Sequence, residues 1–125
     1  MSKKTDPIRL LFVCSQNKWR SRTAEHIFKN KAGWSVRSAG TDRAARIRLN
    51  ANHVTWAEVI FVMEDKHKKR LQQHFRPQLK EQEIIVLDIP DDYPYLDPEL
   101  IEILEESVHY YLEEEEEDDL KNEGE

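Results

Sequence analysis

Short apolar runs alternate with segments of helical spacing along most of this chain. Nearly continuous apolar residues stand at 8–13, 58–63 and 83–89. Runs of this length and composition predict strands that are buried on both faces of a sheet. A fourth segment, WSVRSAGT at 34–41, alternates polar and apolar residues and ends in small residues, so it also predicts a strand.

Helical patterns fill the intervals between these strands. We expect helices at 21–33, 64–75 and 98–112, with a weaker helical pattern over 43–57. The last helix follows Asp97 and starts with Pro98, the order typical of an N-cap and a first helical position. Because strand and helix alternate, the sequence predicts an α/β fold, a three-layer sandwich with a central four-stranded parallel sheet.

Length and composition indicate one domain in a reducing compartment. The 125 residues are enough for a single core, which we place in residues 1–112. The single cysteine excludes an intramolecular disulfide framework. No apolar stretch reaches the roughly 18 residues of a membrane helix, and the run at 8–14 is too short for a signal peptide. We therefore expect a cytoplasmic protein with no membrane partner.

Charge is distributed unevenly around the net value of −6. Residues 113–125 are mostly acidic and are expected to form a disordered tail, because like charges repel and bury nothing. Residues 1–48 carry twelve Lys or Arg residues against three Asp or Glu residues. This basic half suits an anionic ligand. Nucleic-acid binding is disfavoured, because the chain has no recognisable nucleic-acid-binding motif or aromatic platform.

Cys14 is the candidate nucleophile. It ends the first predicted strand, and ligands of parallel sheets bind at the carboxyl ends of the strands. The segment CSQNKWRS places Arg20 six residues after Cys14. A five-residue loop before a helix can curl its backbone N–H groups around a phosphate-sized anion, and Arg20 can donate to two phosphate oxygens. The alternative is that Cys14 is a small buried hydrophobic residue, the usual fate of a lone cysteine.

Two further residues suit such a loop. Asn17 tolerates the left-handed backbone that the curl requires better than most residues do. The Ser21 hydroxyl, together with the positive field of the loop, would stabilise Cys14 as the nucleophilic thiolate. The residue types and their spacing therefore favour a phosphate-binding loop with a cysteine nucleophile.

Four stretches resemble the low-molecular-weight protein tyrosine phosphatases, in the order of that family and over residues 8 to about 104. LLFVCSQNKWRSRTAEHIF is similar to the phosphate loop and first helix, and LDIPDDY to the aspartate loop. RSAGT and WAEVIFVMEDKH are similar to the second and third strand regions. The nearest resemblance is to a group of short bacterial predicted tyrosine phosphatases. It implies that fold and a cofactor-free hydrolase, with a phosphorylated protein or a small aryl phosphate as substrate.

The resemblance also implies a role for each matching residue. Cys14 is the nucleophile that forms a cysteinyl phosphate, Arg20 binds the phosphate, and Asp91 is the general acid and base. Ser38 supports the loop through hydrogen bonds to Asn17. The implied phosphate and substrate site consists of Ser15, Gln16, Asn17, Lys18, Trp19, Arg20, Ser21 and Tyr93.

The sequence departs from the family pattern in the loop and in the segment after it. Gln16 stands where the family has a glycine, which makes close backbone approach harder. Residues 42–57 are fewer than in the family and lack the loop that supplies a second aromatic wall, so we expect a shallower site. The PDDY stretch offers both Asp91 and Asp92 as the acid, and alignment favours Asp91.

Other functions remain open at this point. The five histidines have no metal-ligand spacing, so no metal is expected, and His67 and His74 are expected to be solvated on the basic helix. A non-catalytic module that binds phosphate or a phosphorylated protein would use the same loop. An arsenate reductase is less favoured, because without a second cysteine it would depend on an external thiol.

Overall fold

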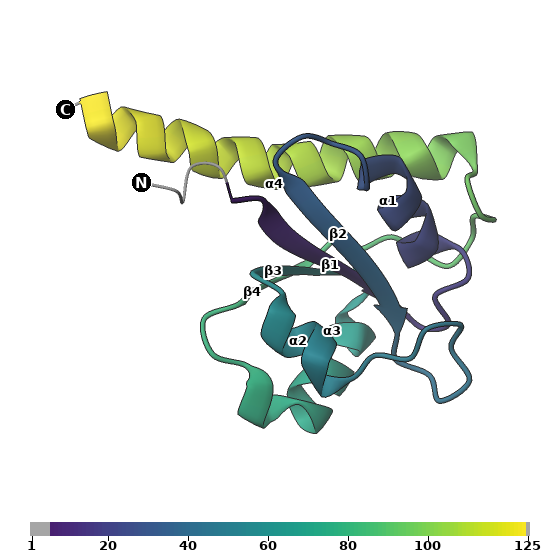
Figure 1. Cartoon of the computed structure of the whole chain (residues 1–125). Coiled ribbons are helices and arrows are strands. Elements are labelled where there is room, and N and C mark those ends of the chain that lie inside the picture. Colours follow the sequence, from purple (N-terminus) through teal and green to yellow (C-terminus); the bar gives the residue numbers. More distant parts are fainter. Residues whose placement is uncertain (1–5, 125) are drawn as a thin grey trace.

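Four parallel strands form the sheet at the centre of the molecule (Figure 1). The structure is a computed structural model, which describes the backbone of residues 6–124 and the side chains of residues 6–112. The strands are β1 (Ile8–Cys14), β2 (Trp34–Gly40), β3 (Val59–Val62) and β4 (Glu83–Val86), in the spatial order β2-β1-β3-β4. The predicted four-stranded parallel sheet is confirmed. The strand order reverses next to β1, and such a switch point is where parallel sheets bind ligands.

Helices cover both faces of this sheet (Figure 1). The helices α1 (Arg20–Phe28) and α4 (Pro98–Gly124) lie on one face, and α2 (Ala51–Trp56) and α3 (Asp65–His74) lie on the other. A 3-10 helix, η2 (Arg76–Gln78), follows α3. The predicted three-layer sandwich is therefore also confirmed.

The alternation of side chains along β1 fills two cores. Leu10, Phe12 and Cys14 face α1 and α4, whereas Leu11 and Val13 face α2 and α3. All five residues are almost completely buried, which explains the nearly continuous apolar run in the sequence.

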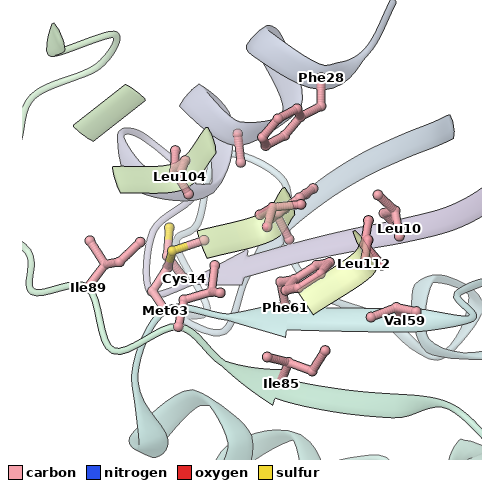
Figure 2. Packing of buried hydrophobic residues seen from close by; sticks show 14 of the residues in the cluster. Leu10, Cys14, Phe28, Val59, Phe61, Met63, Ile85, Ile89, Leu104 and Leu112 are labelled. Atoms are coloured by element: carbon pink, nitrogen blue, oxygen red, sulfur yellow. The ribbon is translucent and has the colours of Figure 1, made fainter. Parts of the chain in front are cut away.

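Aromatic stacking forms the middle of the first core. The ring of Phe12 lies between Phe28 of α1 and Phe61 of β3, with centroid distances of 5.7 and 5.2 Å. Figure 2 shows this cluster with Cys14 at one end, where Met63 and Ile89 also lie. The cluster thus anchors Cys14 at the carboxyl end of the central strand.

The segment after β2 differs from its prediction. The helical pattern over 43–57 produces a helix at 51–56 only, where the side chain of Asn50 accepts a hydrogen bond from the His53 amide at 3.1 Å. Residues 41–49 are irregular and pair with the end of the edge strand β2. Gly40 donates to the Ile47 carbonyl and accepts from the Leu49 amide, both at 2.8 Å. These bonds give the segment backbone partners that a helix would otherwise supply.

The last helix begins as the sequence predicts. Oδ2 of Asp97 accepts from the amides of Glu99 and Leu100 at 3.0 and 3.1 Å, so Asp97 caps α4. The helix continues past residue 112. The side chains of 113–125 lie outside the described residues, and the division into a domain at 1–112 and a disordered tail at 113–125 stays a prediction. Within residues 6–124, no helix is both long and apolar enough to cross a membrane.

The substitution Gly40→Ala should destabilise the protein and distort the segment after β1. A Cβ atom at Gly40 would lie 2.5 Å from the Ser15 carbonyl oxygen and 2.9 Å from the Gln16 carbonyl carbon, and backbone atoms cannot move aside cheaply. We expect a loss of about 1–3 kcal/mol in unfolding free energy, the usual range for overpacking. Denaturant unfolding measures this loss, and amide chemical shifts of Ser15 and Gln16 report the distortion.

Gly33→Ala is the matched control for this prediction. Gly33 has a φ of 86° and open space around it, so alanine there costs about 1–2 kcal/mol of backbone strain without touching the segment after β1. Equal shifts of the Ser15 and Gln16 amides in both variants would contradict the prediction.

Candidate active site

The loop between β1 and α1 curls around the sulfur of Cys14. Asn17 has a φ of 58°, so the predicted left-handed backbone is confirmed. This turn lets the Asn17 amide donate to Cys14 Sγ at 3.2 Å. Cys14 is 3% exposed, and it also lines an open cavity. Cys14 is therefore both a member of the core and accessible to a ligand, which resolves the two readings of a lone cysteine.

A directed chain of hydrogen bonds holds this loop. The side-chain nitrogen of Asn17, Nδ2, donates to Ser21 Oγ at 2.7 Å and to Ser38 Oγ at 2.9 Å. The Ser38 hydroxyl then donates to Glu25 of α1. Ser21 Oγ lies 3.0 Å from Cys14 Sγ, and it is the donor when the sulfur is a thiolate. Asn17, Ser21 and Ser38 are buried, and the side-chain nitrogen of Asn17 links the two hydroxyls. Oδ1 of Asn17 is also buried and has no hydrogen-bond partner among the described residues.

Arg20 points from the first turn of α1 to the carboxyl ends of β3 and β4. Its side chain is 2% exposed, and Nη1 donates to the Ile89 carbonyl at 2.8 Å and to the carboxylate of Glu64. A buried guanidinium requires such partners, since an unpaired charge away from water is very costly. Burial by itself would raise the pKa of Glu64, but the hydrogen bond and charge of Arg20 hold it below its ordinary value.

One buried donor of Arg20 has no acceptor. Among the described residues, Nε makes no hydrogen bond, although Oδ1 of Asp91 lies 3.5 Å away. Arg20 also lines the cavity that exposes Cys14. A buried cationic donor beside an open cavity is a binding position for an anion.

The cavity has a volume of about 330 Å³ and a mostly charged wall. Its lining residues are Cys14, Ser15, Gln16, Lys18, Trp19, Arg20, Asp42, Lys66 and Asp91. Trp19 is 45% exposed and is the aromatic residue of this set. Tyr93 lies outside the set, and its hydroxyl donates to Glu99 at 3.3 Å. The structure thus brings most of the predicted site residues together, and it brings in Asp91 but not Asp92.

The irregular segment 41–49 forms hydrogen bonds to the backbone of the loop between β1 and α1. The amides of Thr41, Asp42 and Arg46 donate to the carbonyls of residues 14, 15 and 16, each at 2.9 Å. The side chain of Arg46 donates from Nε to the Asn17 carbonyl at 3.0 Å. This segment therefore supports the loop through the loop's carbonyls.

His67 does not lie where the sequence predicts it. We expected a solvated side chain on a basic helix, but His67 is 1% exposed. Its Nδ1 accepts from the Glu64 amide at 3.1 Å, and its Nε2 lies 2.9 Å from Ser15 Oγ. Burial lowers the pKa of His67 to about 4, and the charge of Arg20 adds to this effect. The expectation was wrong because the helix turns His67 and the buried Leu71, four residues apart, toward the sheet.

Sequence reasoning missed several residues that hold the site. These are Glu25, Arg46, Glu64 and His67. Only His67 carries a local signal, its spacing of four residues from Leu71; the others have charged side chains that are typical of exposed helix and loop positions. Among the side chains of residues 6–112, no three His, Cys, Asp or Glu residues gather as a metal site would require.

Solved structures of other proteins have the same architecture. The YwlE arginine phosphatase from Geobacillus stearothermophilus matches with a TM-score of 0.69 and 22% identity, over 90% of this chain and 97% of that protein. A low-molecular-weight protein tyrosine phosphatase from T. tengcongensis matches with a TM-score of 0.62 and 22% identity, over 80% and 92% of the two chains. This chain has the fold of the low-molecular-weight protein tyrosine phosphatases.

A third structure with this fold was solved with a ligand. Vibrio vulnificus Wzb in complex with benzylphosphonate matches with a TM-score of 0.68 and 19% identity, over 86% of this chain and 98% of that protein. No protein-family model and no curated protein sequence matches the chain. The resemblance found in the sequence is thus confirmed at the level of the phosphatase fold.

Acid should destabilise the protein partly through His67. Its pKa of about 4 in the folded state lies below the ordinary 6.5, so the unfolded chain binds the extra proton between these values. The contribution of neutral His67 to the unfolding free energy is therefore fully present above pH 6.5, and it is lost as the pH falls toward 4. We expect His67 to contribute roughly 2 kcal/mol to the loss of unfolding free energy between pH 7.5 and 5.

Denaturant unfolding of wild type and His67→Gln across this pH range measures that contribution. Glutamine does not titrate, so the difference in stability between the two proteins should shrink as the pH falls. Parallel curves would show that protonation of His67 does not oppose folding.

Proposed function

We propose that this protein is a cysteine-dependent phosphomonoester hydrolase that acts on a phosphorylated protein or a small aryl phosphate. The observation that carries the proposal is that one cavity is lined by Cys14 and by Arg20, whose buried Nε makes no hydrogen bond among the described residues. A phosphate group there would accept from Arg20 and from the loop amides while its phosphorus faces Cys14 Sγ. The phosphatase fold and the fit of charge support the same reaction.

The reaction would proceed in two displacements. The Cys14 thiolate attacks phosphorus, the bond to the leaving oxygen breaks, and Asp91 gives its proton to that oxygen. Asp91 then takes a proton from water, whose oxygen attacks the cysteinyl phosphate and releases inorganic phosphate and the thiolate. Arg20 and the backbone N–H groups stabilise the charge on the three equatorial oxygens, so no metal ion is needed for this role.

Asp91 fits the acid role better than its neighbour. Its carboxylate lies beside Arg20 and lines the cavity, whereas Asp92 does neither. Asp91 is 58% exposed, so it can exchange protons with water between the two steps. The position of its carboxylate supports proton transfer to an oxygen held above Cys14.

Substitutions of the nucleophile and the acid test this function. Cys14→Ser should abolish hydrolysis of para-nitrophenyl phosphate, because no other nucleophile lines the cavity in the same position. Asp91→Asn should lower kcat roughly a hundredfold or more, in the range of general acid–base catalysis. It should also remove the decline of kcat at high pH, which reflects loss of the acid's proton. Steady-state kinetics across pH measures both effects.

Asp92→Asn is the matched control, since it removes the same charge from the same loop. This variant should keep most of the activity, and equal losses in both aspartate variants would refute the choice of Asp91. An inert wild type that still binds inorganic phosphate would favour the non-catalytic phosphate-binding module. Activity that needs arsenate and an added thiol would favour the reductase.

The substrate class can be tested on matched peptides. Trp19 offers the cavity an aromatic wall, which favours an aryl phosphate such as phosphotyrosine. One protein of the same fold is an arginine phosphatase, so phosphoarginine belongs in the comparison. We expect a higher kcat/KM for a phosphotyrosine peptide than for phosphoserine or phosphoarginine peptides of the same sequence. Trp19→Ala should reduce this preference, and an unchanged preference would exclude Trp19 as its source.

A further inference from the structure

The histidine of α3 is held in one tautomer. Both ring nitrogens of His67 have partners, and the Glu64 amide is a donor, so Nδ1 accepts and carries no proton. The single proton of the neutral ring therefore lies on Nε2, 2.9 Å from Ser15 Oγ. The His67 pKa of about 4 keeps the ring neutral at physiological pH. Nε2–H must then donate, and Ser15 must accept.

This donation fixes what the Ser15 hydroxyl can do. A hydroxyl has one hydrogen to donate and two lone pairs to accept with. With one lone pair occupied by His67, the hydrogen of Ser15 is available for another acceptor. Ser15 lines the cavity next to Cys14 and Arg20, so a ligand's oxygen can be that acceptor.

We infer that His67 is a positioning residue, which orients the Ser15 hydroxyl as a side-chain donor to a phosphate oxygen in the cavity. The inference rests on the proposed function, because it names a further contact of the same phosphate site. Ser15 would touch the ligand, and His67 would act only through Ser15. The two residues lie 52 positions apart in the chain, so this contact also ties α3 to the loop.

The chain offers two substitutions at His67 that separate its two hydrogen bonds. In His67→Asn, the amide oxygen can take the place of Nδ1 and keep the bond from the Glu64 amide, but nothing reaches Ser15. In His67→Gln, the amide nitrogen can take the place of Nε2 and keep the donation to Ser15. Ser15→Ala removes the proposed donor itself.

Binding of inorganic phosphate, followed by NMR titration of the loop amides, tests the inference without requiring turnover. Ser15→Ala should weaken binding roughly tenfold, the effect of losing one hydrogen bond to a charged group. His67→Asn should weaken it to a similar extent, and His67→Gln should restore binding close to wild type. The double variant Ser15→Ala/His67→Asn should bind no more weakly than Ser15→Ala alone, because both changes remove the same contact.

Two results of the binding measurements would overturn the inference. One is additive losses in the double variant, which would mean that His67 supports the site by packing rather than through Ser15. The other is wild-type affinity in Ser15→Ala, which would mean that Ser15 does not contact the phosphate. The ring nitrogen chemical shifts of His67 give a separate check, since a proton on Nδ1 at neutral pH would also refute it.

These outcomes are distinct from failure of the proposed function. A wild type that binds phosphate with the expected pattern of variants but hydrolyses no phosphomonoester would end the catalytic proposal and leave this inference standing. If the wild type hydrolyses para-nitrophenyl phosphate while Ser15→Ala and His67→Asn bind phosphate normally, this inference is refuted and the catalytic proposal stands. Absence of both binding and hydrolysis would refute both proposals.

Discussion

The buried guanidinium of Arg20 is the interaction on which the rest of the site depends. A positive charge with 2% of its side chain exposed is tolerated only because the Glu64 carboxylate and the Ile89 carbonyl accept from it. These acceptors follow β3 and β4, so one side chain joins the carboxyl ends of two strands to α1. The pairing also leaves Nε without a hydrogen bond among the described residues, and Arg20 lines the cavity together with Cys14. The charge that holds these segments together is thus also the charge that the proposed function uses to bind an anion.

A loop without glycine needs support from outside. Gln16 occupies a position where a glycine would ease the curl, and only Asn17 takes the left-handed conformation in this loop. The irregular segment 41–49 binds the loop's carbonyls, and Gly40 provides the space for their close approach. The segment in which the sequence predicted a missing aromatic wall therefore supports the loop backbone. The glycine that matters here is thus at the end of the neighbouring strand, where a Cβ would meet the Ser15 carbonyl.

Polar side chains from three elements hold the loop in place. Asn17 joins Ser21 and Ser38 below Cys14, and Glu25 closes this chain from α1. His67 reaches Ser15 from α3 on the other side of the sheet's edge. These bonds hold the loop in one conformation. Among the described residues, the buried atoms left without a hydrogen bond are Oδ1 of Asn17 and Nε of Arg20. A preorganised loop is what a phosphate site requires.

The sequence alone determined the strands and helices and the loop that carries the candidate site. Hydrophobic periodicity specified four strands and their helices, because burial on one or both faces imposes a period that is visible locally. Asp97 as a helix cap, Asn17 as the left-handed residue and the spacing of Cys14 and Arg20 are also local features, so each was predictable from a few neighbouring residues.

Only the tertiary structure decided which distant side chains complete the site. Glu64 and His67 look like solvated residues of a basic helix. In the structure, His67 is buried against the loop and the partly buried Glu64 pairs with Arg20, because α3 packs beside the loop. The sequence likewise did not determine the conformation of residues 41–49. Their weak helical pattern competes with backbone hydrogen bonds to β2, which form only in the folded sheet. Contacts between residues far apart in the chain depend on how the layers pack, and no local pattern records them.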